Sequence, residues 1–239
     1  MKLTVDYQYG IEFADYDGED KTSFMWWTVN HLASVRVHVA AQLHVYKALA
    51  RHTDSIDYVT EFFGGCGFGT AMVQGIFHPE EHNVIDLDQA CVDHIAAQGF
   101  GAGVSVGQGD AKQAMLRPVK SDLIVCDFFS FTAHQMKDWR PQLDNLFKSS
   151  PKAIQITDTS LARLHLQRER YATALGHEFG TAEEYLLAYS ERFREDYGYS
   201  LLAAGHREFA AMMFVPSDEV ASPNIKHLSV VEGNEAVQA

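Results

Sequence analysis

Three aspartates between residues 86 and 127 stand at, or just after, short apolar runs: Asp86, Asp110 and Asp127. An apolar run of this length predicts a strand, so each carboxylate is expected at a strand end. A carboxylate in such a place can accept hydrogen bonds from two neighbouring hydroxyls, such as those of a ribose. The three residues therefore indicate a site for a ligand that contains a nucleoside.

A glycine-rich segment precedes these aspartates. Residues 59–70 read VTEFFGGCGFGT, which predicts a strand, a tight turn and a helix from about Thr70 to Phe77. Glycine suits such a turn because its backbone adopts positive φ and approaches a ligand where a Cβ would clash. Asp86 follows after about 20 residues, the spacing of a nucleotide-binding βαβ unit. A turn that binds no ligand is the alternative, but four strand-like segments in a row, three of them ending in an acid, count against it.

The rest of the chain supplies elements that can support this site. Apolar positions at helical spacing predict a long helix from about Ser23 to Arg51. Later segments predict a helix, a fifth strand, two more helices and a closing hairpin, at 132–147, 153–157, 160–175, 181–196, and 199–204 with 208–215. We therefore expect an N-terminal extension at 1–22 that could form a hairpin, one main domain at 23–216 with a helical insertion at about 160–196, and a loose acidic tail at 217–239.

Composition indicates an ordinary globular protein. Of 239 residues, 46% are hydrophobic and 12% aromatic, which is enough for a packed core. No apolar run approaches the ~20 residues of a membrane-spanning helix and the first residues lack the apolar core of a signal peptide, so we expect a cytoplasmic protein. Cys66, Cys91 and Cys126 lie far apart in sequence, which is typical of reduced thiols and offers no metal or disulfide spacing. The net charge of −13 argues against strong general affinity for nucleic acid.

Histidines and arginines gather on the predicted helices. His31, His38 and His44 lack the i, i+4 spacing of a zinc pair, so we interpret them as surface or half-buried side chains. Arginines concentrate in the helical insertion, where neighbouring acids favour a solvated helical face. An anionic ligand would use the same side chains, which are Arg163, Arg168, Arg170, Arg192 and Arg194.

Over residues 57–216, this order of motifs resembles the class I (Rossmann-like) S-adenosylmethionine-dependent methyltransferases. The resemblance implies an α/β fold with a mostly parallel sheet, a closing antiparallel hairpin and helices on both faces. It also implies S-adenosylmethionine as the cofactor, with the ribose at Asp86, the adenine at Asp110 and the acceptor facing Asp127. The full set of cofactor positions implied is Glu61, Phe63, Gly65, Cys66, Gly67, Gly69, Asp86, Leu87, Asp110, Ala111 and Asp127.

The glycine segment departs from the commonest form of the family. That form places an acid two residues before the first glycine of G-x-G-x-G, whereas Glu61 stands further upstream. The segment looks more like the D-L-F-x-G-x-G form, which is frequent among methyltransferases of nucleic-acid bases but is not confined to them. The acceptor is therefore expected to be a small molecule or a nucleobase amine.

On the acceptor side, the fourth strand end reads Asp127-Phe128-Phe129-Ser130. Methyl transfer is an in-line displacement, so an enzyme mainly has to place the acceptor close and aligned. In the amino-methyltransferases of adenine and cytosine this site reads D-P-P-Y, and the present chain keeps the acid but loses both prolines. We assign Asp127, Phe128 and Phe129 to the catalytic site, with Asp127 in contact with the acceptor. The stacking aromatic could be Phe129 or Phe131, since the family position for it is Ser130, and an ordinary core role is the alternative for all three phenylalanines.

Two other function classes remain open. A nicotinamide-dependent oxidoreductase shares the βαβ fingerprint, but the carboxylates after the third and fourth strands and the closing hairpin count against it. A non-catalytic protein could keep the methyltransferase fold for partner binding, and the missing prolines beside Asp127 favour that alternative.

Overall fold

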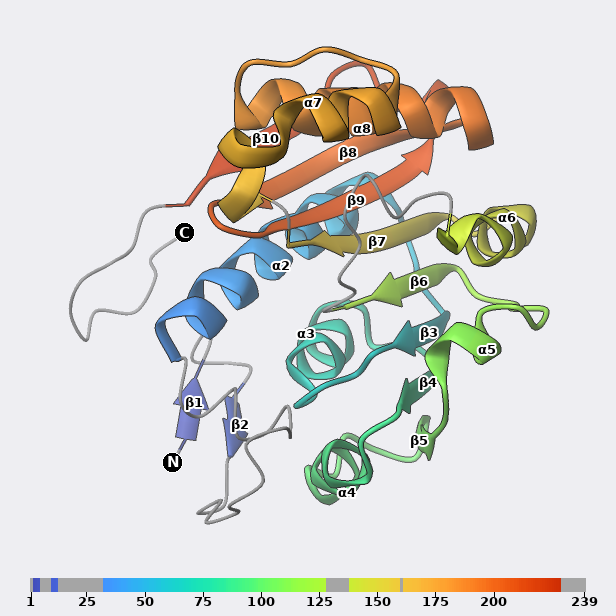
Figure 1. Cartoon of the computed structure of the whole chain (residues 1–239). Helices are drawn as coiled ribbons and strands as arrows, with labels where there is room; N and C mark the ends of the chain where they lie inside the picture. Colours follow the sequence, from blue (N-terminus) through green and yellow to red (C-terminus); the bar gives the residue numbers. More distant parts are fainter. Residues whose placement is uncertain (1, 5–9, 13–31, 128–137, 160, 229–239) are drawn as a thin grey trace.

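The structure is a computed structural model, and it describes residues 2–4, 10–12, 32–127, 138–159 and 161–228. An eight-stranded sheet crosses the centre and helices cover both of its faces (Figure 1). The strands lie in the order β10-β8-β9-β7-β6-β3-β4-β5. Their bounds are β3 (Tyr58–Phe62), β4 (Glu81–Asp86), β5 (Val104–Gln108), β6 (Leu123–Cys126), β7 (Ala153–Asp158), β8 (Tyr199–His206), β9 (Ala210–Pro216) and β10 (Asn224–His227).

Strand β9 runs opposite to both of its neighbours. It pairs antiparallel with β7, where Ile154 lies opposite Phe214, and antiparallel with β8, where Leu201 lies opposite Phe214. The other pairs of this sheet, β10–β8, β7–β6, β6–β3, β3–β4 and β4–β5, are parallel. The sheet is therefore mostly parallel with one antiparallel hairpin, which confirms the predicted fold class.

Two buried clusters form the core, one on each face of the sheet. The cluster beneath α2 and α3 contains Val39, Val125 and Met213. The cluster beneath α5, α6, α7 and α8 contains Ile154 and Tyr185. The helix bounds are α2 (Leu32–His52), α3 (Phe68–Phe77), α4 (Gln89–Ala97), α5 (Ala111–Ala114), α6 (Arg140–Lys148), α7 (Leu164–Leu175) and α8 (Ala182–Tyr197).

The helical insertion forms as expected. Helices α7 and α8 connect β7 to β8, and Gly176 ends α7 in a left-handed conformation. The predicted capping box begins α8, because Thr181 accepts a hydrogen bond from the Glu184 N–H and Glu184 accepts one from the Thr181 N–H. Gln167 interrupts α7 with non-helical backbone angles.

The two ends of the chain depart in part from expectation. Near the N-terminus, β1 (Lys2–Thr4) and β2 (Gly10–Glu12) form the antiparallel pair that the alternating pattern suggested, while residues 13–31 lie outside the described part of the chain. The prediction of a loose tail from residue 217 was wrong for Asn224–His227, because these residues form β10 at the edge of the sheet. Residues 229–239 and much of the predicted helix 132–147 lie outside the described residues.

One face of the sheet carries polar side chains inside an apolar layer. Side chains alternate along a strand, so Glu61 shares the α2 face with Val59, and Gln155 shares it with Ala153. Register places Glu61 opposite Val125, and Val125 opposite Gln155. Glu61 and Gln155 are therefore two buried polar side chains within an apolar layer, and Val125 lies between them.

Candidate active site

The glycine turn leads from β3 into α3 through left-handed backbone. Gly65 and Gly67 have φ of 54° and 81°, a region that glycine enters without steric cost. Phe63 has φ of 64°, which costs a bulky residue about 1–3 kcal/mol. Strain of this kind persists where the surrounding structure enforces it, and it clusters at ligand-binding loops.

Asp86 at the end of β4 holds this turn. Its Oδ2 accepts the Gly65 N–H at 2.8 Å and its Oδ1 accepts the Asp88 N–H at 2.8 Å. Burial raises the pKa of Asp86, although the N–H groups of Asp88 and Gly65 act in the opposite direction. A carboxylate has about four acceptor positions, so each oxygen retains capacity for a ligand hydroxyl.

The neighbours of Asp86 make an open surface at the carboxyl ends of β4 and β5. Leu87 is 69% exposed, which is high for a large apolar side chain. Asp110 is exposed, and its Oδ1 caps α5 by accepting the Lys112 N–H at 2.9 Å. This surface offers an apolar contact between two carboxylates, an arrangement that suits an adenosine.

Glu61 occupies the opposite, buried side of the turn. Its side chain is completely buried, and its Oε2 accepts the Thr70 hydroxyl at 2.8 Å. A Cβ on residue 69 would lie 2.5 Å from Oε1, so any larger residue at position 69 would have to displace the carboxylate. Burial raises the pKa of Glu61, and this effect outweighs the opposing influence of His82 and Thr70.

His82 of β4 links Glu61 to α3. Its Nε2 lies 3.0 Å from Oε2 of Glu61, and both side chains are completely buried. The Gln74 amide nitrogen lies 3.2 Å from Nδ1, and an amide nitrogen can only donate. The network therefore assigns the ring proton to Nε2, facing Glu61.

Asp127 follows β6, and the side chains of His38 and Thr157 both contact its Oδ1 atom. His38 Nε2 lies 2.8 Å from Oδ1, and the Thr157 hydroxyl donates to the same atom at 3.3 Å. The Gln155 amide donates to the Thr157 oxygen at 3.0 Å, which directs the Thr157 proton towards Asp127. Asp127 is 2% exposed, so this carboxylate is held inside the protein.

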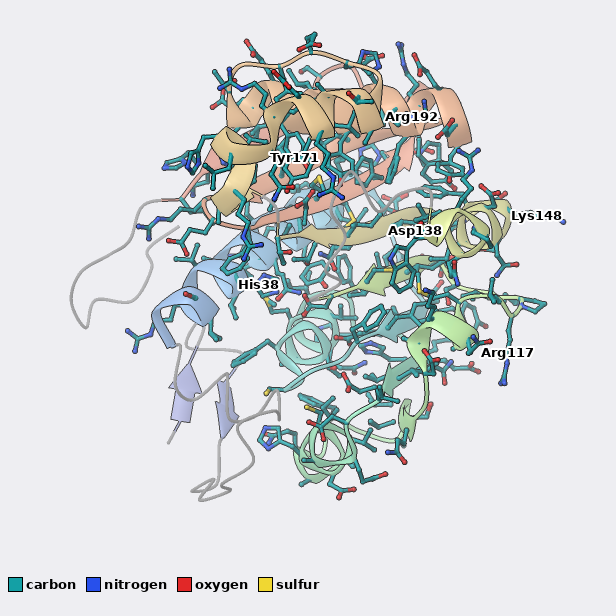
Figure 2. All side chains as sticks on the ribbon, in the orientation of Figure 1. His38, Arg117, Asp138, Lys148, Tyr171 and Arg192 are labelled. Carbon is teal, nitrogen blue, oxygen red and sulfur yellow. The ribbon has the colours of Figure 1, made fainter. Side chains whose placement is uncertain are left out.

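The interpretation of His38 as a surface or half-buried side chain was wrong, because His38 is completely buried. Figure 2 shows His38 on α2, and its ring contacts Asp127, which follows β6. Its ring also meets Phe209 edge-on, with centroids 6.1 Å apart. His44 fits the interpretation, since it is partly exposed and contacts the Asn224 carbonyl at 3.4 Å, and His31 lies outside the described residues.

Gln42 and Tyr46 extend a polar face along α2. They follow His38 at intervals of four residues, so all three share one side of the helix. Both Gln42 amide atoms and the Tyr46 hydroxyl are buried, and no hydrogen-bond partner lies within reach of them in the part of the chain that the structure describes. Burial raises the pKa of Tyr46 well above its usual value, and the nearby Glu61 and Asp127 add to the effect.

Cys66 in the glycine turn lies against Cys91 of α4. A hydrogen bond between the two thiols is the main cause that raises the pKa of Cys91, and burial is the second. Both cysteines are buried and form no disulfide, and the same holds for Cys126, whose pKa burial also raises. Two thiols that lie 25 positions apart in the sequence therefore meet in the fold.

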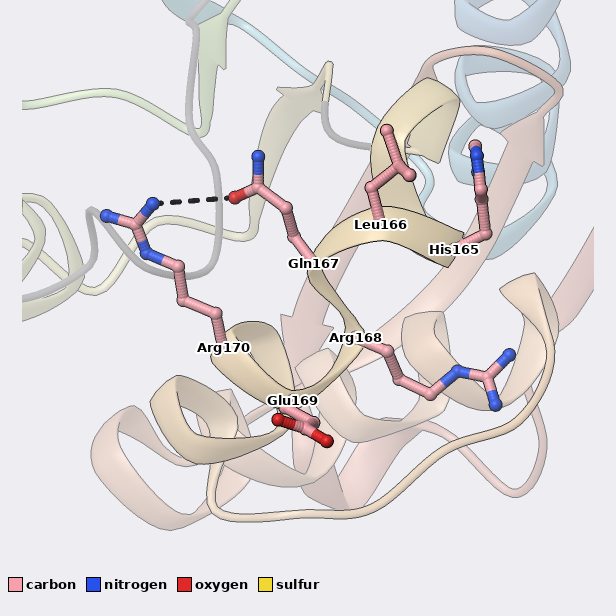
Figure 3. A pocket seen from close by; sticks show the side chains of 6 residues that line it. All are labelled: His165, Leu166, Gln167, Arg168, Glu169 and Arg170. Atoms are coloured by element: carbon pink, nitrogen blue, oxygen red, sulfur yellow. Dashed lines mark hydrogen bonds between the residues drawn. The ribbon is translucent and has the colours of Figure 1, made fainter.

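The arginines of the insertion have local partners. Arg192 pairs with Asp196 at 2.9 Å, Arg194 pairs with Glu191, and Arg168 donates to the Gly180 carbonyl at 3.1 Å. Figure 3 shows a hollow at the interruption of α7, where the side chains of Arg168 and Arg170 point away from one another. This geometry favours a solvated helical face over a convergent anion site.

Phe128, Phe129 and Phe131 lie outside the described residues, so their catalytic-site and stacking roles stay predictions. Within the described ranges, no three His, Cys, Asp or Glu side chains are grouped so that they could hold a metal ion. Over the same ranges, no helix has the length and apolar character needed to cross a bilayer.

No family model matches the sequence, and no curated protein matches it. Solved structures do match. Trm1 from Pyrococcus horikoshii, in complex with S-adenosyl-L-methionine, gives a TM-score of 0.65 at 10% identity, with 92% of this chain and 62% of that chain covered. This chain thus spans less than two thirds of the length of Trm1.

The match extends over nearly the whole length of two further structures. The putative methyltransferase yhhF from Escherichia coli gives a TM-score of 0.52 at 11% identity, over 91% of this chain and 99% of that chain. The plantazolicin methyltransferase BamL, in complex with a triazolic desmethylPZN analog and S-adenosylhomocysteine, gives 0.52 at 13% identity, over 84% and 92%. At these identities the likeness shows the fold, which is that of the class I methyltransferases.

Proposed function

We propose that this chain, which has the class I methyltransferase fold, is an S-adenosylmethionine-dependent methyltransferase. The observation that carries the proposal is the antiparallel β9 between β7 and β8 in a sheet whose glycine turn is bound to Asp86. The structures with this fold include Trm1 with S-adenosylmethionine and BamL with S-adenosylhomocysteine. They support the cofactor class and leave the acceptor open.

The residues around the glycine turn fit this cofactor. The two acceptor oxygens of Asp86 suit the ribose hydroxyls. The exposed side chain of Leu87 suits a face of the adenine, and the carboxylate of Asp110 suits its polar edge. Gly65, Cys66 and Gly67 would bring backbone close to the methionine part, and Phe63, Gly69 and Ala111 complete the proposed set of cofactor contacts. Glu61 supports the turn from below through Thr70 and His82.

The site has an open half and a closed half. Leu87 and Asp110 are exposed, whereas Glu61, Asp127 and His38 are buried. In the proposed complex the adenosine occupies the open half, and the methyl-bearing end reaches the closed half. The cofactor supplies an electrophilic methyl group, and the chain's own residues orient the acceptor there and exclude water.

A small-molecule acceptor is favoured over a nucleobase in a large nucleic acid. The net charge is −13, and the arginines Arg192 and Arg194 are already paired with acids. Association with nucleic acid depends on basic surface that neutralises phosphates. Neither the nicotinamide nor the partner-binding alternative is favoured by the fold likeness, since Trm1 was solved with S-adenosyl-L-methionine and yhhF and BamL carry methyltransferase names.

Calorimetry with S-adenosylhomocysteine and with NAD tests the proposal. We expect binding of the first and little heat from the second. Preference for NAD would overturn the assignment, and a protein that binds S-adenosylhomocysteine but transfers no methyl group to any acceptor class would support the partner-binding alternative.

A further inference from the structure

His206 ends β8 with a buried ring whose two nitrogens are unsatisfied. The residue is 3% exposed, and neither ring nitrogen has a hydrogen-bond partner among the described residues. A neutral imidazole has one donor and one acceptor, so leaving both unpaired inside the protein costs free energy. A Cβ on Gly205 would face Ala41 of α2, and side chains alternate along a strand, so His206 points to the opposite face of the sheet, where α8 lies.

His227 of β10 lies beside His206. The two residues are paired in the parallel register of β8 and β10, and paired residues on neighbouring strands face the same side of a sheet. Ile225, two positions before His227, packs against the buried cluster beneath α8. The two imidazole rings have centroids 5.1 Å apart and planes inclined by 64°. Because His227 is exposed, the pair lies at the protein surface with His206 on its inner side.

A carboxylate from a third element lies near this pair. Helix α8 ends at Tyr197 and β8 begins at Tyr199, so the chain reverses there and the start of α8 lies near the end of β8. Glu183, in the first turn of α8, is close enough for its charge to act on the His206 ring. The whole chain also has a net charge of −13. Both the local and the overall charge therefore favour a cation at this place.

The spacing of the two rings suits a shared metal ion. Imidazole nitrogen is a common ligand of Zn²⁺, Cu²⁺ and Ni²⁺. A tetrahedral ion about 2.0–2.1 Å from one nitrogen of each ring would hold the ring centres roughly 5 Å apart. The centroids of His206 and His227 already have this separation, and the exposed ring of His227 is free to turn a nitrogen towards the ion.

We propose that His206 and His227 are the two protein ligands of a site for a divalent transition-metal ion, for which Zn²⁺ is the probe. Water fills the remaining positions, and Glu183 accepts a hydrogen bond from one of these waters. The ion gives the buried His206 ring the partner it lacks and joins β10 to β8. Two histidines suffice for such a site, which is consistent with the lack of a group of three ligands among the described residues. Methyl transfer plays no part in this binding.

Calorimetry on the full chain without an affinity tag tests the site, after a chelator has removed bound metal. We expect one equivalent of Zn²⁺ to bind, Cu²⁺ to bind more tightly and Mg²⁺ not to bind, because imidazole suits the transition metals. His227→Gln removes a ligand at an exposed position and should weaken Zn²⁺ binding at least tenfold. His52→Gln is the matched control, because His52 is partly exposed and lies 2.9 Å from Glu219, and it should keep the affinity within twofold.

Thermal stability provides a second measurement. An ion that binds only the folded chain stabilises it by mass action, so Zn²⁺ at about 100 times its dissociation constant should raise the melting temperature by roughly 5 °C or more. His227→Gln and His206→Gln should each lose this increase, with melting of each variant without metal as the reference for changes in packing. No Zn²⁺ binding by the wild type, unchanged affinity in His227→Gln, or loss of binding in His52→Gln would each overturn the proposal.

Discussion

The Glu61 carboxylate fills the space that a side chain at position 69 would need. A Cβ on Gly69 would lie 2.5 Å from Oε1 of Glu61 and 3.6 Å from Oδ2 of Asp127. The first turn of α3 thus passes directly over a buried carboxylate and meets its charge with the Thr70 hydroxyl. This contact joins the glycine turn to Glu61 and, through Glu61, to His82 of β4.

Gly69→Ala tests that contact. The added methyl must displace a buried carboxylate, and overpacking of this kind costs about 1–3 kcal/mol. We expect a lower melting temperature and at least tenfold weaker binding of S-adenosylhomocysteine by calorimetry. Gly107→Ala is the matched control, because no atom lies within 4 Å of its added Cβ. Equal behaviour of the two variants would contradict the role of the contact.

Asp86→Ala should weaken the binding of S-adenosylhomocysteine by at least tenfold, since charge-assisted hydrogen bonds contribute roughly 1.5–3 kcal/mol each. It should also lower stability, because Asp86 accepts the N–H groups of Gly65 and Asp88. Asp88→Ala removes the cap of α4 and should cost about 1 kcal/mol of stability with much less effect on binding. Stronger loss of affinity in Asp88→Ala would show that the ribose position has been assigned to the wrong residue.

Glu61→Gln should change how stability depends on pH. Burial raises the folded-state pKa of Glu61 above its unfolded value, so the stabilisation is complete below the unfolded pKa and is lost as pH rises through the folded pKa. Glutamine cannot ionise. Melting temperatures measured between about pH 4 and 8 should therefore favour the variant progressively over the wild type as pH rises. Glu80→Gln, at an exposed position, is the control, and a variant difference that is flat or falls with pH would count against the buried ionisation.

The cysteines should resist thiol reagents in the folded protein. All three are buried, and the pKa of Cys91 is raised by its hydrogen bond with Cys66 and by burial, so little thiolate forms. We expect Ellman's reagent to react slowly under native conditions and to titrate all three thiols in guanidinium chloride. Rapid reaction of one native thiol would locate an opening beside the turn, and Cys66→Ser would identify it.

Local patterns were enough to predict the fold and to place two of the proposed cofactor carboxylates at strand ends. The glycine spacing and the acids at strand ends placed Asp86 and Asp110 correctly, because each belongs to one short motif. The strand β10 was missed because its four residues are mostly polar and lie at the edge of the sheet. Such a strand is defined by its pairing with β8, which no local pattern encodes.

The closed half depends on contacts between distant segments. The spacing between His38 and the other histidines speaks only to zinc binding. The burial of His38 against Asp127, 89 positions away, was therefore not predicted. A signal was present, since His38, Gln42 and Tyr46 repeat at four residues beside the apolar stripe of α2. The register that brings Thr157 to Asp127 comes from pairing between β6 and β7, which the sequence does not reveal.

Gly205 has a consequence for remodelling this protein. A Cβ on Gly205 would lie 2.8 Å from Cα and 3.0 Å from the carbonyl oxygen of Ala41, so the backbone of α2 rests directly on β8. The backbones of α2 and β8, which lie far apart in the sequence, must therefore match in shape at this contact. A chimera that imported α2 from another protein would have to import a compatible β8 with it. The helix that carries His38 and the strand beneath it would therefore have to be exchanged as one unit.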